Sequence, residues 1–157
     1  MNGSNPMPDA SLRLLGVDPG TKRIGLAVAS ADGFPGRALA TIVRSRRLGH
    51  DLDTIVRVAR EQGAHGIVVG LPRNADGTEG DAARRAREFG AALRKVAPIP
   101  VVFHDEYGTT VAAETDLILA NVPLARRRAL VDQWAAVHLL AAFFSSGASL
   151  ASAGIPE

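Results

Sequence analysis

The run from Leu14 to Ala29, LLGVDPGTKRIGLAVA, constrains the fold of this chain more than any other stretch. It consists of two apolar segments of strand length joined by a turn, in which Pro19-Gly20 fixes one dihedral angle and tolerates the other. The first segment ends in a carboxylate, Asp18. Because a buried carboxylate is costly unless it is compensated, Asp18 is expected to cap the turn, to be paired or hydrogen-bonded, or to bind a metal ion.

The composition is typical of a single globular domain. Of the 157 residues, 46% are hydrophobic and 22% are charged, which is an ordinary balance for a domain with a substantial core. We expect this domain over residues 12–145, with a flexible leader at 1–11 and a flexible tail at 146–157. The chain has no cysteine, which excludes disulfides and thiolate chemistry.

The N-terminal leader, the lengths of the apolar stretches and the types of cation indicate the compartment and the class of partner. The leader has neither the cationic start nor the apolar run of a signal peptide, and no apolar stretch is long enough to span a bilayer. We therefore expect a cytoplasmic protein with no membrane partner. The net charge is only +2, but Lys22 and Lys95 are the only lysines among the 18 cationic residues. Arginine suits bidentate phosphate contacts, so a nucleic-acid partner is compatible with this composition.

The apolar periodicity predicts alternating strands and helices after an initial run of strands. Strands are expected at 12–17, 24–30, 37–43, 66–71 and 99–104, and helices at 48–62, 81–96, 111–120 and 129–144. We expect Thr109 or Thr110 to cap the third helix, and Asn121 to Arg128 to form a loop. The order predicts an α/β fold, with a five-stranded mixed sheet made of a three-strand antiparallel meander and then parallel strands, flanked by helices.

Three acidic sites fall at corresponding places in this scheme. Asp18 ends the first strand, Asp105-Glu106 ends the last strand, and Asp132 lies in the first turn of the last helix. Ligand sites in such sheets gather at the carboxyl ends of parallel strands, so we expect these side chains to converge. Clustered carboxylates repel one another, and oxygen ligands of this kind favour Mg²⁺ or Mn²⁺. Two such ions would support hydrolysis of a phosphodiester bond.

Several motifs of this chain, taken together and in order, resemble the YqgF/RuvX family. They are Val17 to Ala27, Val69-Gly-Leu-Pro72 with Asp76-Gly77, Asp105-Glu106 with Thr109-Thr110, and Val131-Asp132 with Ala135-Ala136. The resemblance covers about residues 12–144. It implies an RNase H-like fold and a nuclease resembling Holliday junction resolvases. The family is also linked to 5′-end processing of pre-16S ribosomal RNA, so the resemblance leaves RNA and branched or single-stranded DNA open as substrates.

The resemblance also assigns roles to particular residues. Asp18, Glu106 and Asp132 match the acidic triad of the family, and Asp105 is the neighbour that could replace Glu106. On this hypothesis Asp18 bridges two metal ions, and Glu106 and Asp132 each bind one. The candidates for contacts with nucleic acid are Lys22, Arg23, Arg73, Asn74, Tyr107 and Thr109. Tyr107-Gly108 stands where many members have Arg-Leu, so either a phosphate contact is missing or Tyr107 stacks on a base.

Other interpretations remain open at this stage. A surface charge is the plain alternative for each cation, and the basic corner Arg44 to Arg47 is interpreted as a solvated run. His104 and His138 could shuttle protons, but they lie in apolar segments and are more simply structural. A nucleic-acid-binding module without catalysis is an alternative function. A fragment of an actin- or Hsp70-like ATPase ranks low, because that superfamily needs two such domains. Dimerisation is also open, since a junction-cutting enzyme needs two sites related by a two-fold axis.

Overall fold

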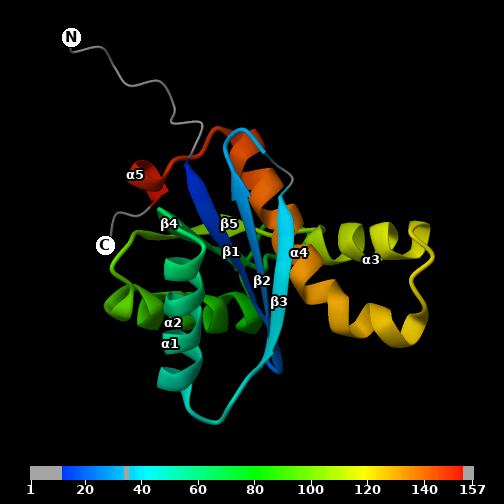
Figure 1. The fold of residues 1–157 in the computed structure, drawn as a ribbon, viewed down its shortest axis with the longest axis horizontal. Helices are drawn as coiled ribbons and strands as arrows, with labels where there is room; N and C mark the ends of the chain where they lie inside the picture. The colour runs from blue at the N-terminus through cyan, green and yellow to red at the C-terminus, as the bar shows by residue number, and fades with distance from the viewer. Residues whose placement is uncertain (1–11, 34–35, 154–157) are drawn as a thin grey trace.

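The computed structural model describes residues 12–33 and 36–153, and their arrangement is drawn in Figure 1. The predicted leader, 1–11, lies outside the described residues. The elements are β1 (Arg13–Pro19), β2 (Arg23–Ser30), β3 (Arg37–Val43), α1 (Leu48–Glu61), β4 (Gly66–Leu71), α2 (Asp81–Val96), β5 (Val101–Asp105), α3 (Thr109–Leu119), α4 (Leu124–Ser146) and α5 (Leu150–Ala153). All five predicted strands and the first two helices are therefore present.

The five strands form one mixed sheet in the order β3-β2-β1-β4-β5. The hairpin of β1 and β2 is antiparallel and places Asp18 opposite Gly25. β3 continues the antiparallel meander on the outer side of β2, whereas β4 and β5 run parallel to β1. This topology confirms the predicted sheet. The last residues of β1, β4 and β5 consequently share one edge, which is where the sequence had placed the carboxylates.

Two apolar cores lie on opposite faces of the sheet. Because side chains alternate along a strand, Leu15 packs with α1 and α2 on one face, whereas the adjacent Leu14 packs with α4 on the other. In Figure 1, α1 and α2 lie on one side of the sheet and α4 crosses the other. These two layers fix the ends of the strands relative to α4, and that relation builds the site.

The α3–α4 region corrects two predictions. The cap of α3 is Gly108, with a φ of 82°, and neither Thr109 nor Thr110 takes that position. The predicted loop from Asn121 to Arg128 is wrong in its second half, because α4 already begins at Leu124, directly after Pro123. The first turns of α4 project beyond the sheet with α3 (Figure 1), so they lack the apolar periodicity on which the prediction depended.

The C-terminal segment is also more ordered than predicted. Residues 150–153 form α5, and the side chain of Leu150 packs against the core on the α4 side of the sheet. The flexible tail expected from residue 146 is therefore wrong as far as residue 153, because one leucine had an apolar surface to cover. Residues 154–157 lie outside the described part of the chain.

No apolar stretch long enough to span a bilayer was expected from the sequence, and the length of α4 changes this expectation. In the described ranges α4 is the one helix that is long and apolar enough, by length and composition, to cross a membrane. Its buried side chains Ala136, Leu140 and Phe143 pack against the sheet. A core helix can satisfy the same criteria, and these contacts place one face of α4 in the core.

Candidate active site

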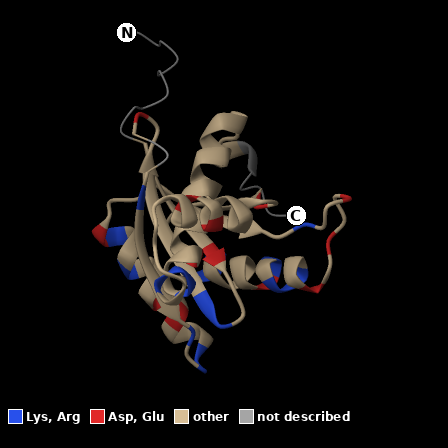
Figure 2. Cartoon of the chain, turned by 90° about the vertical axis from the view of Figure 1, so that its right-hand side faces the viewer, with Lys and Arg blue, Asp and Glu red and all other residues tan. Residues whose placement is uncertain are grey.

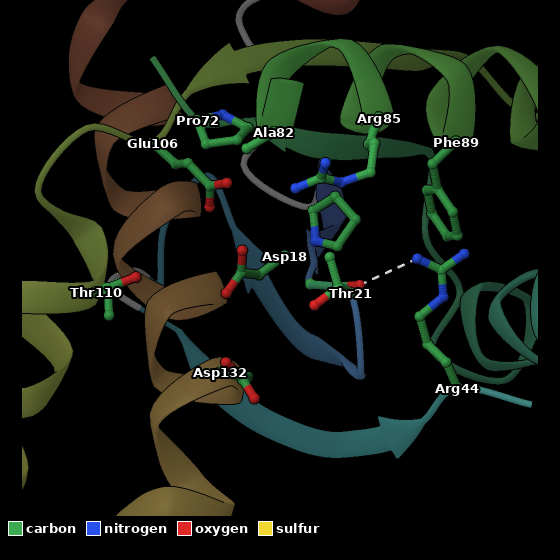
Figure 3. Close-up of a pocket in the computed structure, with 12 residues that line it drawn as sticks. Asp18, Thr21, Arg44, Pro72, Ala82, Arg85, Phe89, Glu106, Thr110 and Asp132 are labelled. Atoms are coloured by element: carbon green, nitrogen blue, oxygen red, sulfur yellow. Dashed lines mark hydrogen bonds between the residues drawn. The ribbon is translucent and has the colours of Figure 1, made fainter. Parts of the chain in front are cut away.

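A cavity of about 250 Å³ opens at the edge where β1 ends, and three carboxylates from separate elements line it. Asp18 comes from the end of β1, Glu106 follows β5, and Asp132 projects from α4, as Figure 3 shows. The other lining residues are Pro19, Gly20, Thr21, Arg44, Pro72, Ala82, Arg85, Phe89 and Thr110. The structure thus brings together the three acids that match the family triad. Asp132 reaches the cavity from inside α4, and not from the first turn of a helix as predicted.

Asp132 can reach the cavity because α4 packs very closely on the sheet. Gly25 lies opposite Asp18 in the hairpin, and a Cβ atom at this position would overlap the backbone carbonyl of Asp132. A glycine is therefore required by close approach rather than by a turn. Asp132 is also paired: its Oδ2 lies 3.2 Å from Nε of Arg23, which donates a hydrogen bond.

Glu106 is held by the short connection between β5 and α3. Its backbone N–H donates to the carbonyl of Leu71, and its own carbonyl accepts from the N–H and the hydroxyl of Thr109. The carboxyl group lies over Gly70, where an added Cβ would come within 2.6 Å of Oε2. Oε2 is buried and has no hydrogen-bond partner among the described residues. An orphaned buried oxygen of this kind indicates a missing ligand or proton.

The electrostatics of the cavity indicate that Asp18 and Glu106 cannot both be charged without compensation. Burial, together with the charge of Asp18, raises the pKa of Glu106 from 4.5 to about 10. Burial also raises the pKa of Asp18; the hydrogen bond with Glu106 lowers it, and the charge of Asp132 raises it further. The Asp18–Glu106 pair therefore shares a proton at neutral pH unless a cation neutralises it.

The donor set fits a hard divalent cation. All three acids offer oxygen, the ligand that Mg²⁺ and Mn²⁺ prefer, and the carboxyl group of Glu106 points toward Asp18 in Figure 3. In residues 12–33 and 36–153, however, no three His, Asp or Glu side chains are close enough to hold one ion as they stand. The ion pair with Arg23 engages Asp132, so binding of a metal by all three acids would require this side chain to move.

The remaining sequence candidates near Glu106 lie apart from the cavity. Asp105 is exposed, its Oδ1 accepts from the N–H of Tyr107 at 2.9 Å, and it is not among the cavity-lining residues. The Tyr107 side chain is exposed as well. Thr109 is buried, and its hydroxyl supports the backbone of Glu106. In the structure Thr109 therefore positions Glu106, whereas its assignment as a contact for nucleic acid stays a prediction.

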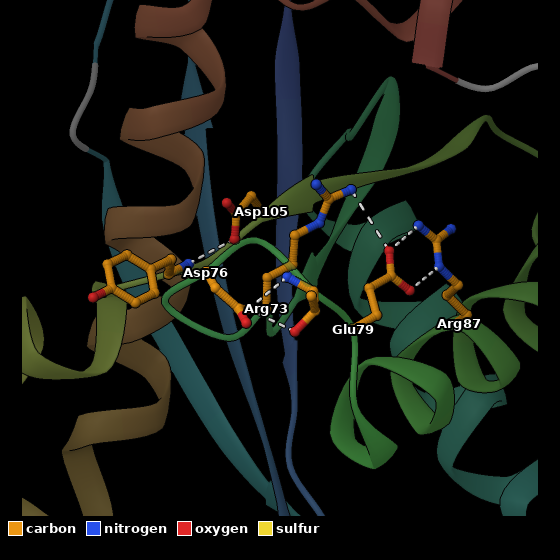
Figure 4. A network of polar contacts seen from close by, with 7 residues as sticks. Arg73, Asp76, Glu79, Arg87 and Asp105 are labelled. Carbon is orange, nitrogen blue, oxygen red and sulfur yellow. Dashed lines mark hydrogen bonds and ion pairs between the residues drawn. The ribbon is translucent and has the colours of Figure 1, made fainter.

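Arg73 and Asn74 belong to a loop that satisfies its own polar groups. Arg73 lies 3.6 Å from Glu79, which also accepts two hydrogen bonds from Arg87, as Figure 4 shows. Asn74 bonds to Thr78 through both backbone and side chain. Both residues lie beside the strand ends as expected, but their side chains are engaged within the loop.

Sequence reasoning missed Arg44 and Arg85 in the cavity wall. Arg44 donates to the carbonyl of Gly20 at 3.1 Å, and its guanidinium lies 5.3 Å from the centre of the Phe89 ring. The antiparallel meander could have indicated Arg44, because it follows directly after Val43, which pairs with Arg23. Arg85 lies four residues before Phe89 on α2, and this spacing puts both on one face of the helix.

His104 and His138 make contacts typical of structural histidines. The ring of His104 packs edge-on against Phe143 with centroids 5.5 Å apart, and burial lowers its pKa. Nε2 of His138 lies 2.6 Å from Asp116, which ties α4 to α3. Neither histidine lines the cavity.

Comparison with known proteins gives consistent results. The family model described as "RuvX: Holliday junction resolvase" matches residues 12–146. A protein of Heliobacterium modesticaldum named "Putative pre-16S rRNA nuclease" is 40% identical over 141 residues, covering 90% of this chain and 94% of the relative. A protein of Moorella thermoacetica with the same name is 41% identical over 129 residues, covering 82% of this chain and 91% of the relative.

Solved structures support the fold. RuvC of Thermus thermophilus, solved in complex with a Holliday junction substrate, superposes with a TM-score of 0.55 at 18% identity and covers 91% of this chain and 98% of its own. The fowlpox virus Holliday junction resolvase superposes with a TM-score of 0.52 at 13% identity, covering 86% and 99%. At these identities the likeness establishes the RNase H-like fold that the sequence predicted.

Proposed function

The chain belongs to the RuvX Holliday junction resolvase family, and we propose that it is a nuclease that hydrolyses phosphodiester bonds with Mg²⁺ or Mn²⁺. The observation that carries this proposal is the cavity in which Asp18, Glu106 and Asp132 meet. The pKa values of Asp18 and Glu106 are raised there. Strongly perturbed carboxyls in a cleft are typical of functional sites rather than of structural ion pairs.

In the proposed reaction the residues of the cavity would have two kinds of role, metal binding and positioning. Asp18, Glu106 and Asp132 would hold the divalent ions, which supply an activated water and stabilise the departing oxygen. Thr109 and Leu71 fix the backbone of Glu106 through hydrogen bonds. Gly25 lets α4 bring Asp132 against the end of β1. The fold therefore brings oxygen donors from β1, the β5–α3 connection and α4 to one cavity, and the Asp132 side chain would leave Arg23 to share an ion with the other two.

We propose ribosomal precursor RNA as the substrate, because the relatives that are about 40% identical are named pre-16S rRNA nucleases. A four-way DNA junction is the second candidate, and it is favoured by the family description. Cleavage of a junction would need two sites related by a two-fold axis. The oligomeric state in solution therefore belongs in the same set of measurements.

The test is a cleavage panel with the purified chain. The substrates are a pre-16S rRNA fragment, single-stranded RNA, single-stranded DNA and a four-way junction, each with Mg²⁺, Mn²⁺ or EDTA. We expect wild-type cleavage only with metal, and a loss of at least about a hundredfold in Asp18→Asn. Asp105→Asn is the matched control, because its exposed carboxyl lies outside the cavity. Full activity of Asp18→Asn, or binding without cleavage on every substrate, would refute the proposal and favour a binding module.

A further inference from the structure

A second hollow of about 660 Å³ adjoins the acidic cavity, and its charge is of the opposite sign. It is lined by Thr21, Lys22, Arg23, Val43, Arg44, Ser45 and Arg85. Thr21, Arg44 and Arg85 also line the acidic cavity, so the two spaces share a wall. Among the described residues that line this second hollow there are four cations and no carboxylate. We call this space the basic groove.

The positive charge of the basic groove is a local property of this part of the molecule. In Figure 2 basic and acidic residues are interspersed along many helices, strands and loops, so the net charge alone would not direct a polyanion to one place. The groove concentrates cations from three separate elements: Lys22 in the β1–β2 turn, Arg44 after β3, and Arg85 on α2. A run of cations brought together in this way, beside an acidic cavity, is an electrostatic footprint for phosphate groups.

Two of these cations are free to meet a ligand. The side chains of Lys22 and Arg85 make no hydrogen bond or ion pair with any other residue in the described ranges. The side chain of Arg73, in the loop beside the strand ends, is instead engaged by Glu79, which also pairs with Arg87. A backbone phosphate would therefore gain more from the basic groove than from the loop at 72–80, where it would have to compete with that ion pair.

The corner that carries Arg44 is rigidly attached. The backbone N–H of Arg44 donates to the carbonyl of Lys22, and its guanidinium bonds to Gly20. The next residue, Ser45, donates its N–H to both carboxylate oxygens of Asp51, which is buried in α1 at 1% exposure. The side of the groove is thus held in place before any ligand binds, which reduces the entropy lost on binding.

We propose that the basic groove binds the sugar–phosphate backbone of one nucleic-acid strand and guides it into the acidic cavity over the β1–β2 turn. The inference rests on the proposed nuclease function and adds the path of the substrate. The charged side chains that line the groove are all cations, and no aromatic side chain is among its described lining residues. Such contacts position a strand but do not read its bases, so binding through this groove is insensitive to sequence.

The test measures binding without cleavage, by fluorescence anisotropy in EDTA with labelled single-stranded RNA and the same sequence as DNA. The variant is Lys22→Gln/Arg85→Gln, and Arg73→Gln is the matched control, because Arg73 lines neither the cavity nor the groove. Each lost phosphate contact reduces the slope of log affinity against log salt by about 0.7 for single strands. We expect a slope smaller by about 1.4 in the double variant, on RNA and on DNA, and no change in the control.

The opposite result overturns the proposal: a reduced slope in Arg73→Gln together with a wild-type slope in the double variant. Circular dichroism and the melting temperature check the fold of each variant, which has no partner to lose at Lys22 or Arg85. The outcome is separable from that of the nuclease proposal. If the wild type cleaves none of the substrates but the double variant still shows the smaller salt slope, the groove binds nucleic acid as proposed and the catalytic assignment fails.

Discussion

Nε of Arg23 lies 3.2 Å from Oδ2 of Asp132, so one of the three cavity carboxylates is already paired with a cation of the chain itself. Arg23 comes from the start of β2 and Asp132 from the middle of α4, which are far apart in sequence. Both side chains remain partly exposed, so the pair contributes modestly to stability. The pair has a greater effect on metal binding, because a metal ion bound at Asp132 must compete with the guanidinium of Arg23.

Arg23→Gln should therefore bind divalent metal more tightly than the wild type. Without the guanidinium, Asp132 adds an uncompensated charge to the cavity. We expect the variant in EDTA to lose up to about 1 kcal/mol of stability, and to gain more than the wild type in melting temperature when Mn²⁺ is added. Isothermal titration calorimetry measures the Mn²⁺ affinity directly.

The control is Arg57→Gln, which removes an exposed ion pair to Glu61 on α1, away from the cavity. This variant should keep the wild-type Mn²⁺ affinity. If Arg23→Gln binds Mn²⁺ as weakly as the wild type or more weakly, the guanidinium does not compete with the metal.

The metal-free protein should lose stability as the pH rises. In the folded protein the pKa of Glu106 is about 10, against an ordinary value of 4.5 in the unfolded chain. Between these values the folded state keeps a proton that the unfolded chain releases, so a higher pH favours unfolding. The raised pKa of Asp18 acts in the same direction. We expect the free energy of unfolding in EDTA to fall between about pH 5 and about pH 9.

Urea unfolding, followed by the fluorescence of the single tryptophan, Trp134, measures this dependence. Glu106→Gln should remove much of the slope and should be more stable than the wild type at the upper end of the range. Saturating Mg²⁺ should weaken the slope in the wild type, because the ion replaces the proton. A slope that is the same in Glu106→Gln and in the wild type would show that this carboxyl is ionised in the folded protein.

Strand ends were the part of the site that sequence could predict. An apolar run that ends in an acid defines both a strand and the edge at which its carboxylate lies, and this held for Asp18 at the end of β1 and Glu106 after β5. The alternation of strands and helices then fixed the sheet. These features depend on local periodicity and on turn residues, which a single sequence displays directly.

Contacts between distant elements could not be predicted in this way. The start of α4 was missed because its first turns project with α3 and cover no apolar surface. The Arg23–Asp132 pair and the placement of Arg85 depend on how helices pack on the sheet, which periodicity does not specify. Arg44 was predictable in principle, by counting along the paired strands from Arg23.

Gly70→Ala should impair the site and spare the fold. The added Cβ would lie 2.6 Å from Oε2 of Glu106, which is the far end of a flexible side chain, so the carboxyl can move aside. We expect a melting temperature within a few degrees of the wild type, but a loss of metal affinity and of cleavage. Calorimetry with Mn²⁺ measures the loss of metal affinity. Wild-type metal affinity in this variant would show that Glu106 is not needed where it now lies.

Gly25→Ala should have the opposite pattern, with the fold itself destabilised. Its Cβ would overlap the backbone carbonyl of Asp132, which belongs to α4 and cannot rotate away, so the helix must shift from the sheet. Overpacking against backbone costs about 3 kcal/mol or more. Gly49→Ala in α1 is the control, because nothing lies within 4 Å of its added Cβ. That variant should be neutral or slightly stabilised. Equal stability of the two alanine variants in urea would mean that α4 does not depend on the close approach at Gly25. The position of Asp132 in the cavity would then need another cause.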